Sequence, residues 1–95
     1  MLNTLESLFN LARERKKSPI DDSYTNKLYR SGMNKMAQKV GEEAVELVIE
    51  AKDDNADLFK EEAADLLYHM LILLKAKGFS LEDIEEVLYE RANSK

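Results

Sequence analysis

Five of the carboxylate side chains that this sequence carries lie beside or inside some of its most apolar segments, where charge is expensive to bury. Glu42, Glu43 and Glu46 belong to the segment KVGEEAVELVIEAK, and Glu62 and Asp65 belong to the segment KEEAADLLYHMLILL. Residues three apart on a helix are neighbours, with Cβ atoms about 5–6 Å apart. The negative charges of neighbouring carboxylates repel each other in a low-dielectric core unless a cation lies between them. Oxygen ligands suit Mg²⁺, with Mn²⁺ also possible, so the spacing predicts a divalent metal site that binds phosphate.

The alternative for an acidic cluster on a helix is an ordinary solvated face. That state is expected for five other acids: Glu50, Glu82, Glu85, Glu86 and Glu90. The two clusters in question differ because both have i,i+3 spacing, both are flanked by aliphatic residues, and a short turn joins the segments that carry them. This combination favours the metal site.

The elements that must position these acids are helices. Hydrophobic residues recur at helical spacing along the chain, and no strand-like alternation, repeat or low-complexity segment is present. Five helices are expected, over roughly residues 2–17, 23–31, 34–53, 56–77 and 81–88. The expected cap and stop residues are Asp22 or Ser23, Gly32, Asn34, Gly78, and Ser80 with Asp83. The pattern therefore predicts an all-α fold in which the third and fourth helices form an antiparallel hairpin.

Length and composition indicate one small domain that spans residues 1–95. A domain of 95 residues buries only about two thirds of its unfolded surface. The fourth helix is apolar nearly all round, which is typical of a central helix, and residues 66–74 carry more apolar surface than one short domain can cover. A homodimer or a larger homo-oligomer is therefore expected.

Charge and residue usage exclude several classes of protein. The net charge of −5 argues against a general nucleic-acid binder, and the absence of cysteine excludes disulfides and thiolate metal sites. The longest apolar run is far short of the ~20 residues that span a bilayer, and the N-terminal segment lacks the apolar core of a signal peptide. The expectation is a cytoplasmic protein that binds neither membranes nor nucleic acids.

The acidic segments and their surroundings resemble a known family. EEAVE and EAAD fit the ExxE and ExxD pattern of the MazG-like all-α nucleotide pyrophosphohydrolases. Together, SYTNKLYRSG, KMAQKVGEEAVE and EEAADLLYH resemble one branch, the phosphoribosyl-ATP pyrophosphohydrolase family, from about residue 4 to 91. The resemblance implies a helical bundle with a long central antiparallel hairpin, completed by oligomerisation. It also implies Mg²⁺-dependent hydrolysis of phosphoribosyl-ATP to phosphoribosyl-AMP and pyrophosphate in L-histidine biosynthesis.

The resemblance assigns roles to the five acids as the catalytic set. Glu43, Glu46, Glu62 and Asp65 would be the metal ligands. Glu42 is then a candidate general base or a group beside the ligands, although spacing alone does not separate Glu42 from Glu43.

A second set of residues is expected to bind the substrate. Its members are Ser23, Tyr24, Thr25, Lys35, Lys39 and His69. Lys39 lies one turn before Glu43, so it can reach a phosphate or form a salt bridge to Glu43 instead. A lone histidine in an apolar helix is more often a buried hydrogen-bonding residue than a catalyst, and Ser23 can serve only as a helix cap. Tyr68 is expected to point elsewhere, as a packing or dimer contact.

Two other functions remain as alternatives. A related MazG-like enzyme that acts on a free nucleoside triphosphate would keep the acidic motifs but has no need of the SYT and YH segments. A helical interaction module would use its acids only to hold structural metal or to face solvent.

Overall fold

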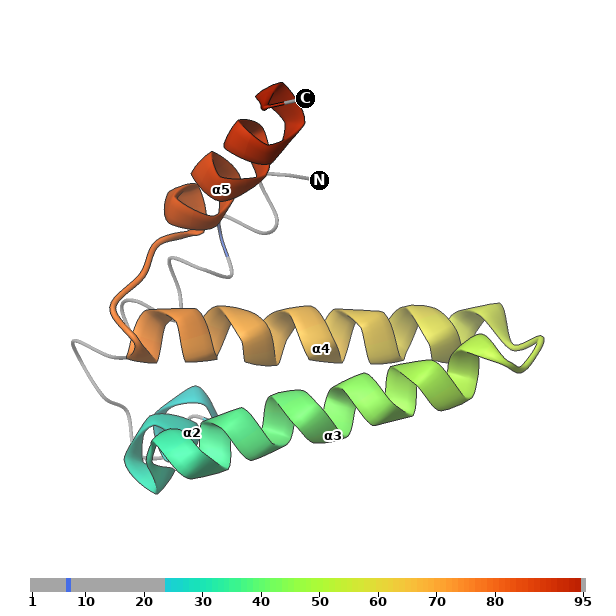
Figure 1. The fold of residues 1–95 in the computed structure, drawn as a ribbon. Coiled ribbons are helices and arrows are strands. Elements are labelled where there is room, and N and C mark those ends of the chain that lie inside the picture. Colours follow the sequence, from blue (N-terminus) through green and yellow to red (C-terminus); the bar gives the residue numbers. More distant parts are fainter. Residues whose placement is uncertain (1–6, 8–23, 95) are drawn as a thin grey trace.

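The computed structural model describes Ser7 and residues 24–94, and within this part of the chain the fold is all-α, as predicted (Figure 1). Residues 24–94 form four helices: α2 (Tyr24–Ser31), α3 (Met33–Ala51), α4 (Ala56–Ala76) and α5 (Leu81–Asn93). The predicted helix over residues 2–17 and the predicted cap at Asp22 or Ser23 lie outside the described residues, apart from Ser7, which is helical. None of the helices in the described ranges is both long and apolar enough to cross a membrane.

The predicted antiparallel hairpin is confirmed, because α3 and α4 lie side by side and run in opposite directions (Figure 1). A short turn joins them, and the Asn55 side chain begins α4 by accepting a hydrogen bond from the backbone N–H of Leu58 at 3.1 Å. α2 packs against both long helices, at the start of α3 and the end of α4 (Figure 1). The hairpin therefore brings the acidic segments of α3 and α4 face to face.

Local chain signals end α4 and begin α5 as predicted. Gly78 has a φ of 86°, a left-handed conformation that glycine adopts without steric cost. The N–H groups of Gly78 and Phe79 donate to the carbonyls of Lys75 and Leu74, which closes the helix end. Ser80 and Asp83 form the predicted capping box, each side chain accepting from the other's backbone N–H.

The prediction that Asn34 caps the third helix is wrong. The N-cap is Gly32, which has a φ of 95° and provides no side-chain hydrogen bond, and Asn34 lies inside the first turn. The left-handed conformation at Gly32 ends α2 and starts α3 within a single residue, so no room remains for a separate cap. Gly32 is thus the helix stop that was expected.

The core lies at the α2 end of the hairpin. Leu28 of α2, Met36 of α3 and Ile72 of α4 form a buried cluster, and Tyr68 packs against it. The fourth helix was expected to be central, yet its Leu67 and Met70 side chains are more than 40% exposed. Within the described part of the chain, only α2 and α3 pack substantially against α4.

Candidate active site

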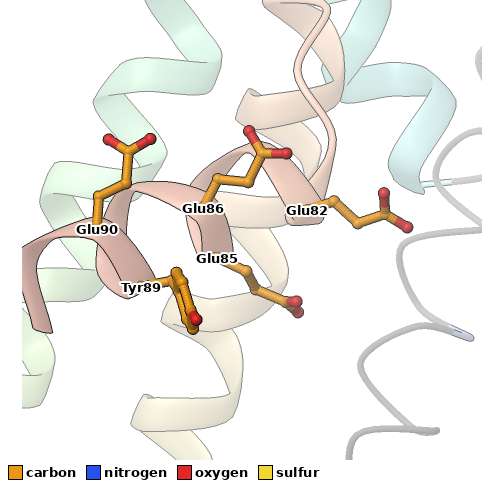
Figure 2. Close-up of a pocket in the computed structure, with 5 residues that line it drawn as sticks. All are labelled: Glu82, Glu85, Glu86, Tyr89 and Glu90. Carbon is orange, nitrogen blue, oxygen red and sulfur yellow. The ribbon is translucent and has the colours of Figure 1, made fainter. Parts of the chain in front are cut away.

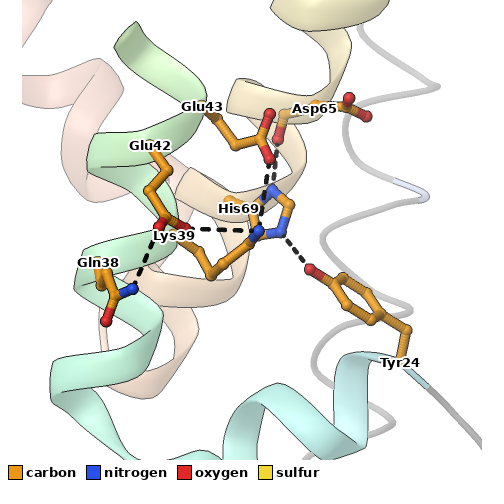
Figure 3. Close-up of polar contacts among 7 residues, drawn as sticks. All are labelled: Tyr24, Gln38, Lys39, Glu42, Glu43, Asp65 and His69. Atoms are coloured by element: carbon orange, nitrogen blue, oxygen red, sulfur yellow. Dashed lines mark hydrogen bonds and ion pairs between the residues drawn. The ribbon is translucent and has the colours of Figure 1, made fainter. Parts of the chain in front are cut away.

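Three of the predicted acids converge between the two long helices. Glu43 from α3 and Glu62 and Asp65 from α4 each offer an oxygen, and these atoms all lie within 4.8 Å of one another. Glu43 is buried, Glu62 is partly buried and Asp65 is exposed, so the group extends from the interior to the surface. The antiparallel hairpin explains this approach, because it places the ExxE segment of one helix opposite the ExxD segment of the other (Figure 3).

Glu46 acts on two members of this group, Glu62 and Glu43. A hydrogen bond with Glu46, then burial and the charges of Glu46, Glu43 and Asp65, raise the pKa of the Glu62 carboxyl to about 7. Burial, followed by a hydrogen bond with Glu46 and nearby negative charge, also raises the pKa of the Glu43 carboxyl. Without a cation, the protein therefore reduces the repulsion among these acids by retaining protons.

Two carboxylate oxygens of the group can still accept a hydrogen bond or bind a cation. Oε2 of Glu43 and Oε2 of Glu62 are buried, and neither has a hydrogen-bond partner within the described residues. Buried oxygens of this kind carry a desolvation penalty that a bound cation would remove. Three converging carboxylates are also the ligand type that Mg²⁺ and Mn²⁺ prefer, so these residues fit a divalent cation.

Glu42 and Glu43, which spacing could not separate, face different ways. Glu42 is exposed, accepts a hydrogen bond from Gln38 Nε2 at 3.1 Å, and does not belong to the converging group (Figure 3). The hydrogen bond from Gln38, aided by the charges of Lys39 and Lys35, lowers the pKa of the Glu42 carboxyl. Glu42 is therefore an ionised carboxylate at the edge of the site.

Lys39 lies between these two glutamates. Its Nζ is 3.6 Å from Oε1 of Glu42 and 3.7 Å from Oε1 of Glu43 (Figure 3). Burial alone would lower the pKa of Lys39, but the neighbouring Tyr24, Glu42 and Glu43 outweigh it and raise the pKa. The salt bridge to Glu43 is thus present, and it holds the ammonium group at the edge of the carboxylate group.

A chain of hydrogen bonds connects the other side of the site to α2. His69 Nδ1 lies 2.8 Å from the backbone oxygen of Asp65, and His69 Nε2 lies 2.8 Å from the Tyr24 hydroxyl (Figure 3). His69 is only 6% exposed. Both of its ring nitrogens are engaged, which is the arrangement expected of a buried hydrogen-bonding histidine.

A second pair of side chains lies beside this chain of hydrogen bonds. The Thr25 hydroxyl is hydrogen bonded to the Tyr68 hydroxyl, and the Tyr68 ring stacks on Tyr24 with a centroid distance of 6.2 Å. The Tyr68 ring also meets His69 edge to face. Tyr68 was expected to point elsewhere, and this expectation is wrong because its ring and hydroxyl contact residues of the candidate site. It also packs against the core, as expected.

The sequence pattern of the family described as Phosphoribosyl-ATP pyrophosphohydrolase matches residues 2–92 of this chain. The chain belongs to this family. It is 51% identical over 87 residues to the Phosphoribosyl-ATP pyrophosphatase of Streptococcus gordonii, which covers 92% of this chain and 84% of that protein. The Phosphoribosyl-ATP pyrophosphatase of Clostridium acetobutylicum is 46% identical over 87 residues, covering 92% and 79%.

A fused relative matches as well. The Histidine biosynthesis bifunctional protein HisIE of Bacteroides thetaiotaomicron is 47% identical over 90 residues, which covers 95% of this chain and 44% of that protein. These matches confirm the resemblance seen in the sequence. As a member of the phosphoribosyl-ATP pyrophosphohydrolase family, the chain is a hydrolase.

In this family member the structure brings together most of the residues expected at the site. Lys35 lies near enough for its charge to act on Glu42, although the residue itself is exposed. Ser23 lies outside the described residues. Two further contributors were not expected, Gln38 and Tyr68. The spacing of Gln38 from Glu42, four residues on a helix, was the signal for the first, and the adjacency of Tyr68 to His69 was the only signal for the second.

The acids outside the site differ in their exposure to solvent. Glu82, Glu85, Glu86 and Glu90 are exposed on α5, as expected, where they line an open hollow of about 420 Å³ with Tyr89 (Figure 2). The expectation of a solvated face is wrong for Glu50, which is partly buried and has a buried Oε2 with no hydrogen-bond partner in the described ranges. Glu50 lies near the end of α3, beside the turn to α4.

Proposed function

We propose that this enzyme hydrolyses phosphoribosyl-ATP to phosphoribosyl-AMP and pyrophosphate in L-histidine biosynthesis. The observation that carries the proposal is the match of nearly the whole chain to proteins of that name, together with the converging carboxylates of α3 and α4. Water would attack the triphosphate between the α and β phosphorus atoms. A cytoplasmic location agrees with this biosynthetic role.

The metal in this proposal is Mg²⁺, with Mn²⁺ as a possible substitute. Glu43, Glu46, Glu62 and Asp65 would hold it, which is supported by the convergence of Glu43, Glu62 and Asp65 and by the effect of Glu46 on the pKa of Glu43 and of Glu62. When bound, a divalent cation would neutralise charge on the phosphate oxygens and favour ionisation of the attacking water.

The chain's own residues would orient the triphosphate and handle the proton. Lys39 would exchange its salt bridges with Glu42 and Glu43 for a phosphate oxygen, since its ammonium group already lies at the edge of the carboxylates. Glu42 stays the candidate general base because it is an exposed, ionised carboxylate at the edge of the site, although its lowered pKa makes it a weaker base than an ordinary glutamate. Lys35 would add positive charge one turn away.

The remaining substrate contacts belong to the start of α2. Tyr24 and Thr25, with Ser23 before them, would border the nucleotide, because the Tyr24 hydroxyl lies close enough to Lys39, Glu43 and Asp65 for their charges to act on it. Direct contact of His69 with substrate stays a prediction. An open hollow of about 720 Å³ lies along one face of α3 next to Glu42 and Glu46, and part of the ligand would lie there. Its lining residues are Gln38, Gly41, Glu42, Val45 and Glu46.

We also propose that the enzyme is a homodimer or a larger homo-oligomer. The support is the exposed apolar surface of the hairpin, which includes more of α3 than the sequence suggested. The side chains concerned are Val45, Val48, Ile49, Leu67 and Met70, each between 41% and 59% exposed. A second copy of the chain would cover this surface.

A product assay tests the proposed activity. Purified protein is incubated with Mg²⁺ and either phosphoribosyl-ATP, ATP or dCTP, and pyrophosphate and orthophosphate are measured separately. We expect pyrophosphate from phosphoribosyl-ATP and loss of turnover in excess chelator. Preference for a free nucleoside triphosphate would favour a different MazG-like enzyme, and release of orthophosphate first would contradict the assignment.

A further inference from the structure

The hydrogen bonds of His69 determine which of its nitrogens carries a proton. Nδ1 lies 2.8 Å from the backbone oxygen of Asp65, and a carbonyl oxygen can only accept a hydrogen bond. Nδ1 must therefore donate. In a neutral imidazole the other nitrogen is then an acceptor, so the Tyr24 hydroxyl, 2.8 Å from Nε2, donates to it.

This assignment restricts what the Tyr24 hydroxyl can bind. A phenol has one proton, and here it is committed to His69, so the oxygen can only accept further hydrogen bonds. The oxygens of an ionised phosphate are also acceptors. Tyr24 therefore cannot donate to the triphosphate, and any ligand group that it contacts must carry a donor, such as a hydroxyl or an amine.

The hydroxyl is held in place although Tyr24 as a whole is 48% exposed. Its ring is stacked on Tyr68, and Tyr68 is tied to Thr25 through their hydroxyl groups. His69, which accepts the Tyr24 proton, is buried. The Thr25–Tyr68 and Tyr24–His69 hydrogen bonds join residues that are 43 and 45 positions apart in the sequence. The SYT and YH segments thus form one unit that fixes the start of α2 on α4.

The same oxygen lies at the border of the carboxylate group. Lys39, Glu43 and Asp65 are close enough to the Tyr24 hydroxyl to act on it electrostatically. A nucleotide whose phosphates lie at the carboxylates and Lys39 would bring its sugar or base toward this border.

We propose that His69 is a positioning residue: it keeps the Tyr24 oxygen as a hydrogen-bond acceptor for a hydroxyl or amino group of the bound nucleotide. Tyr24 then selects for the nucleoside part of the ligand, and His69 acts through Tyr24. The identity of the nucleotide rests on the proposed function.

The proton assignment is tested without turnover. His69 is the only histidine in the chain, so a long-range proton–nitrogen correlation spectrum of labelled protein at pH 8 reports its tautomer without ambiguity. We expect a proton on Nδ1 and none on Nε2. A ring with the proton on Nε2 would overturn the proposal, whatever the substrate of the enzyme.

The role of the oxygen is tested with Tyr24→Phe, which keeps the stacked ring and removes the hydroxyl. We expect KM for phosphoribosyl-ATP to rise about three- to tenfold with kcat within about twofold, as for loss of one neutral hydrogen bond made equally in ground and transition states. Tyr89→Phe, the same change at an exposed tyrosine of α5, is the control and should leave both constants unchanged. An unchanged KM in Tyr24→Phe, or a loss confined to kcat, would overturn the proposal.

The positioning role is tested by two changes at His69. His69→Leu removes the acceptor and should raise KM as Tyr24→Phe does, with no further rise when the two are combined. His69→Gln places an amide oxygen near the position of Nε2 and should recover much of the parental KM. Additive effects in the double variant would refute the role. If His69→Leu does not fold, the comparison of His69→Gln with Tyr24→Phe still tests the positioning role. A KM in His69→Gln as high as that in Tyr24→Phe would also refute it.

These results separate this inference from the proposed function. If the parent protein does not hydrolyse phosphoribosyl-ATP, the proposed function fails. The spectrum still tests the His69 proton assignment, because it does not depend on turnover. If the parent is active and Tyr24→Phe matches it, only the inference fails.

Discussion

Binding of a divalent cation to the carboxylate group should release protons in a pH-dependent way. The Glu62 carboxyl has a pKa of about 7, because it is hydrogen bonded to Glu46, partly buried and surrounded by other acids. A metal ligand must be deprotonated, so a proton still on Glu62 leaves when the cation binds. For a pKa of about 7, the protons released from this residue number about 0.9 at pH 6, 0.5 at pH 7 and 0.1 at pH 8. Glu43, whose pKa is also raised, adds to the release at the acidic end.

The assay is isothermal titration calorimetry with Mg²⁺ or Mn²⁺, repeated at each pH in two buffers of different ionisation enthalpy. The difference in observed enthalpy gives the number of protons released. The apparent affinity should also weaken as pH falls below 7, by up to tenfold per unit while Glu62 is the main proton that must leave.

Two variants make this measurement specific. Glu62→Gln cannot release the proton and should lose most of the pH dependence together with much of the affinity. Glu61→Gln alters the neighbouring exposed acid, which lies outside the converging group, and should behave as the parent. Release near zero at pH 6, or the same release from Glu62→Gln as from the parent, would refute the account of these carboxylates.

Four further outcomes are expected. Folding raises the pKa of Glu62 from its ordinary value of 4.5 to about 7, so the folded state binds more protons than the unfolded state between these two pH values. The cation-free protein should therefore lose stability as pH rises through that window, and Glu62→Gln should melt higher than the parent at pH 8 but not at pH 4. Lys39→Ala should lower kcat/KM tens-fold or more, whereas Lys60→Ala, an exposed lysine of α4, should match the parent; equal kinetics would leave Lys39 with only its salt bridges. Light scattering should give at least a dimer at micromolar concentration, and Leu67→Glu should reduce the mass; a monomeric parent would contradict the proposed assembly. Ile72→Ala should cost about 2–5 kcal/mol in denaturant unfolding, since its side chain is 1% exposed, and a loss under about 1 kcal/mol would contradict its place in the core.

The sequence by itself determined the features that depend on neighbours along the chain. Helical periodicity predicted the all-α fold and the hairpin, and the Ser80–Asp83 box and Gly78 were readable because a cap involves residues within one or two turns. The spacing of the acids also indicated which two segments carry carboxylates on one helix side, because i,i+3 neighbours share a helix side whatever the rest of the fold does. Metal binding by these carboxylates stays a prediction. The exception was the start of α3, where Gly32, which has a positive φ, is the N-cap residue in place of the expected Asn34.

Only the tertiary structure decided which way each helix is turned. Glu42 and Glu43 are adjacent in sequence and about 100° apart around α3, so the packing of α3 on α4 alone determines that Glu43 is buried among the acids of α4 while Glu42 is exposed. The pairing of Tyr24 with His69 was likewise beyond local signals, because it joins residues 45 apart that meet only after α2 packs on the hairpin. The sequence determines which residue types are available for catalysis and binding. Their protonation and their partners depend on burial and distance, which arise only once the helices pack.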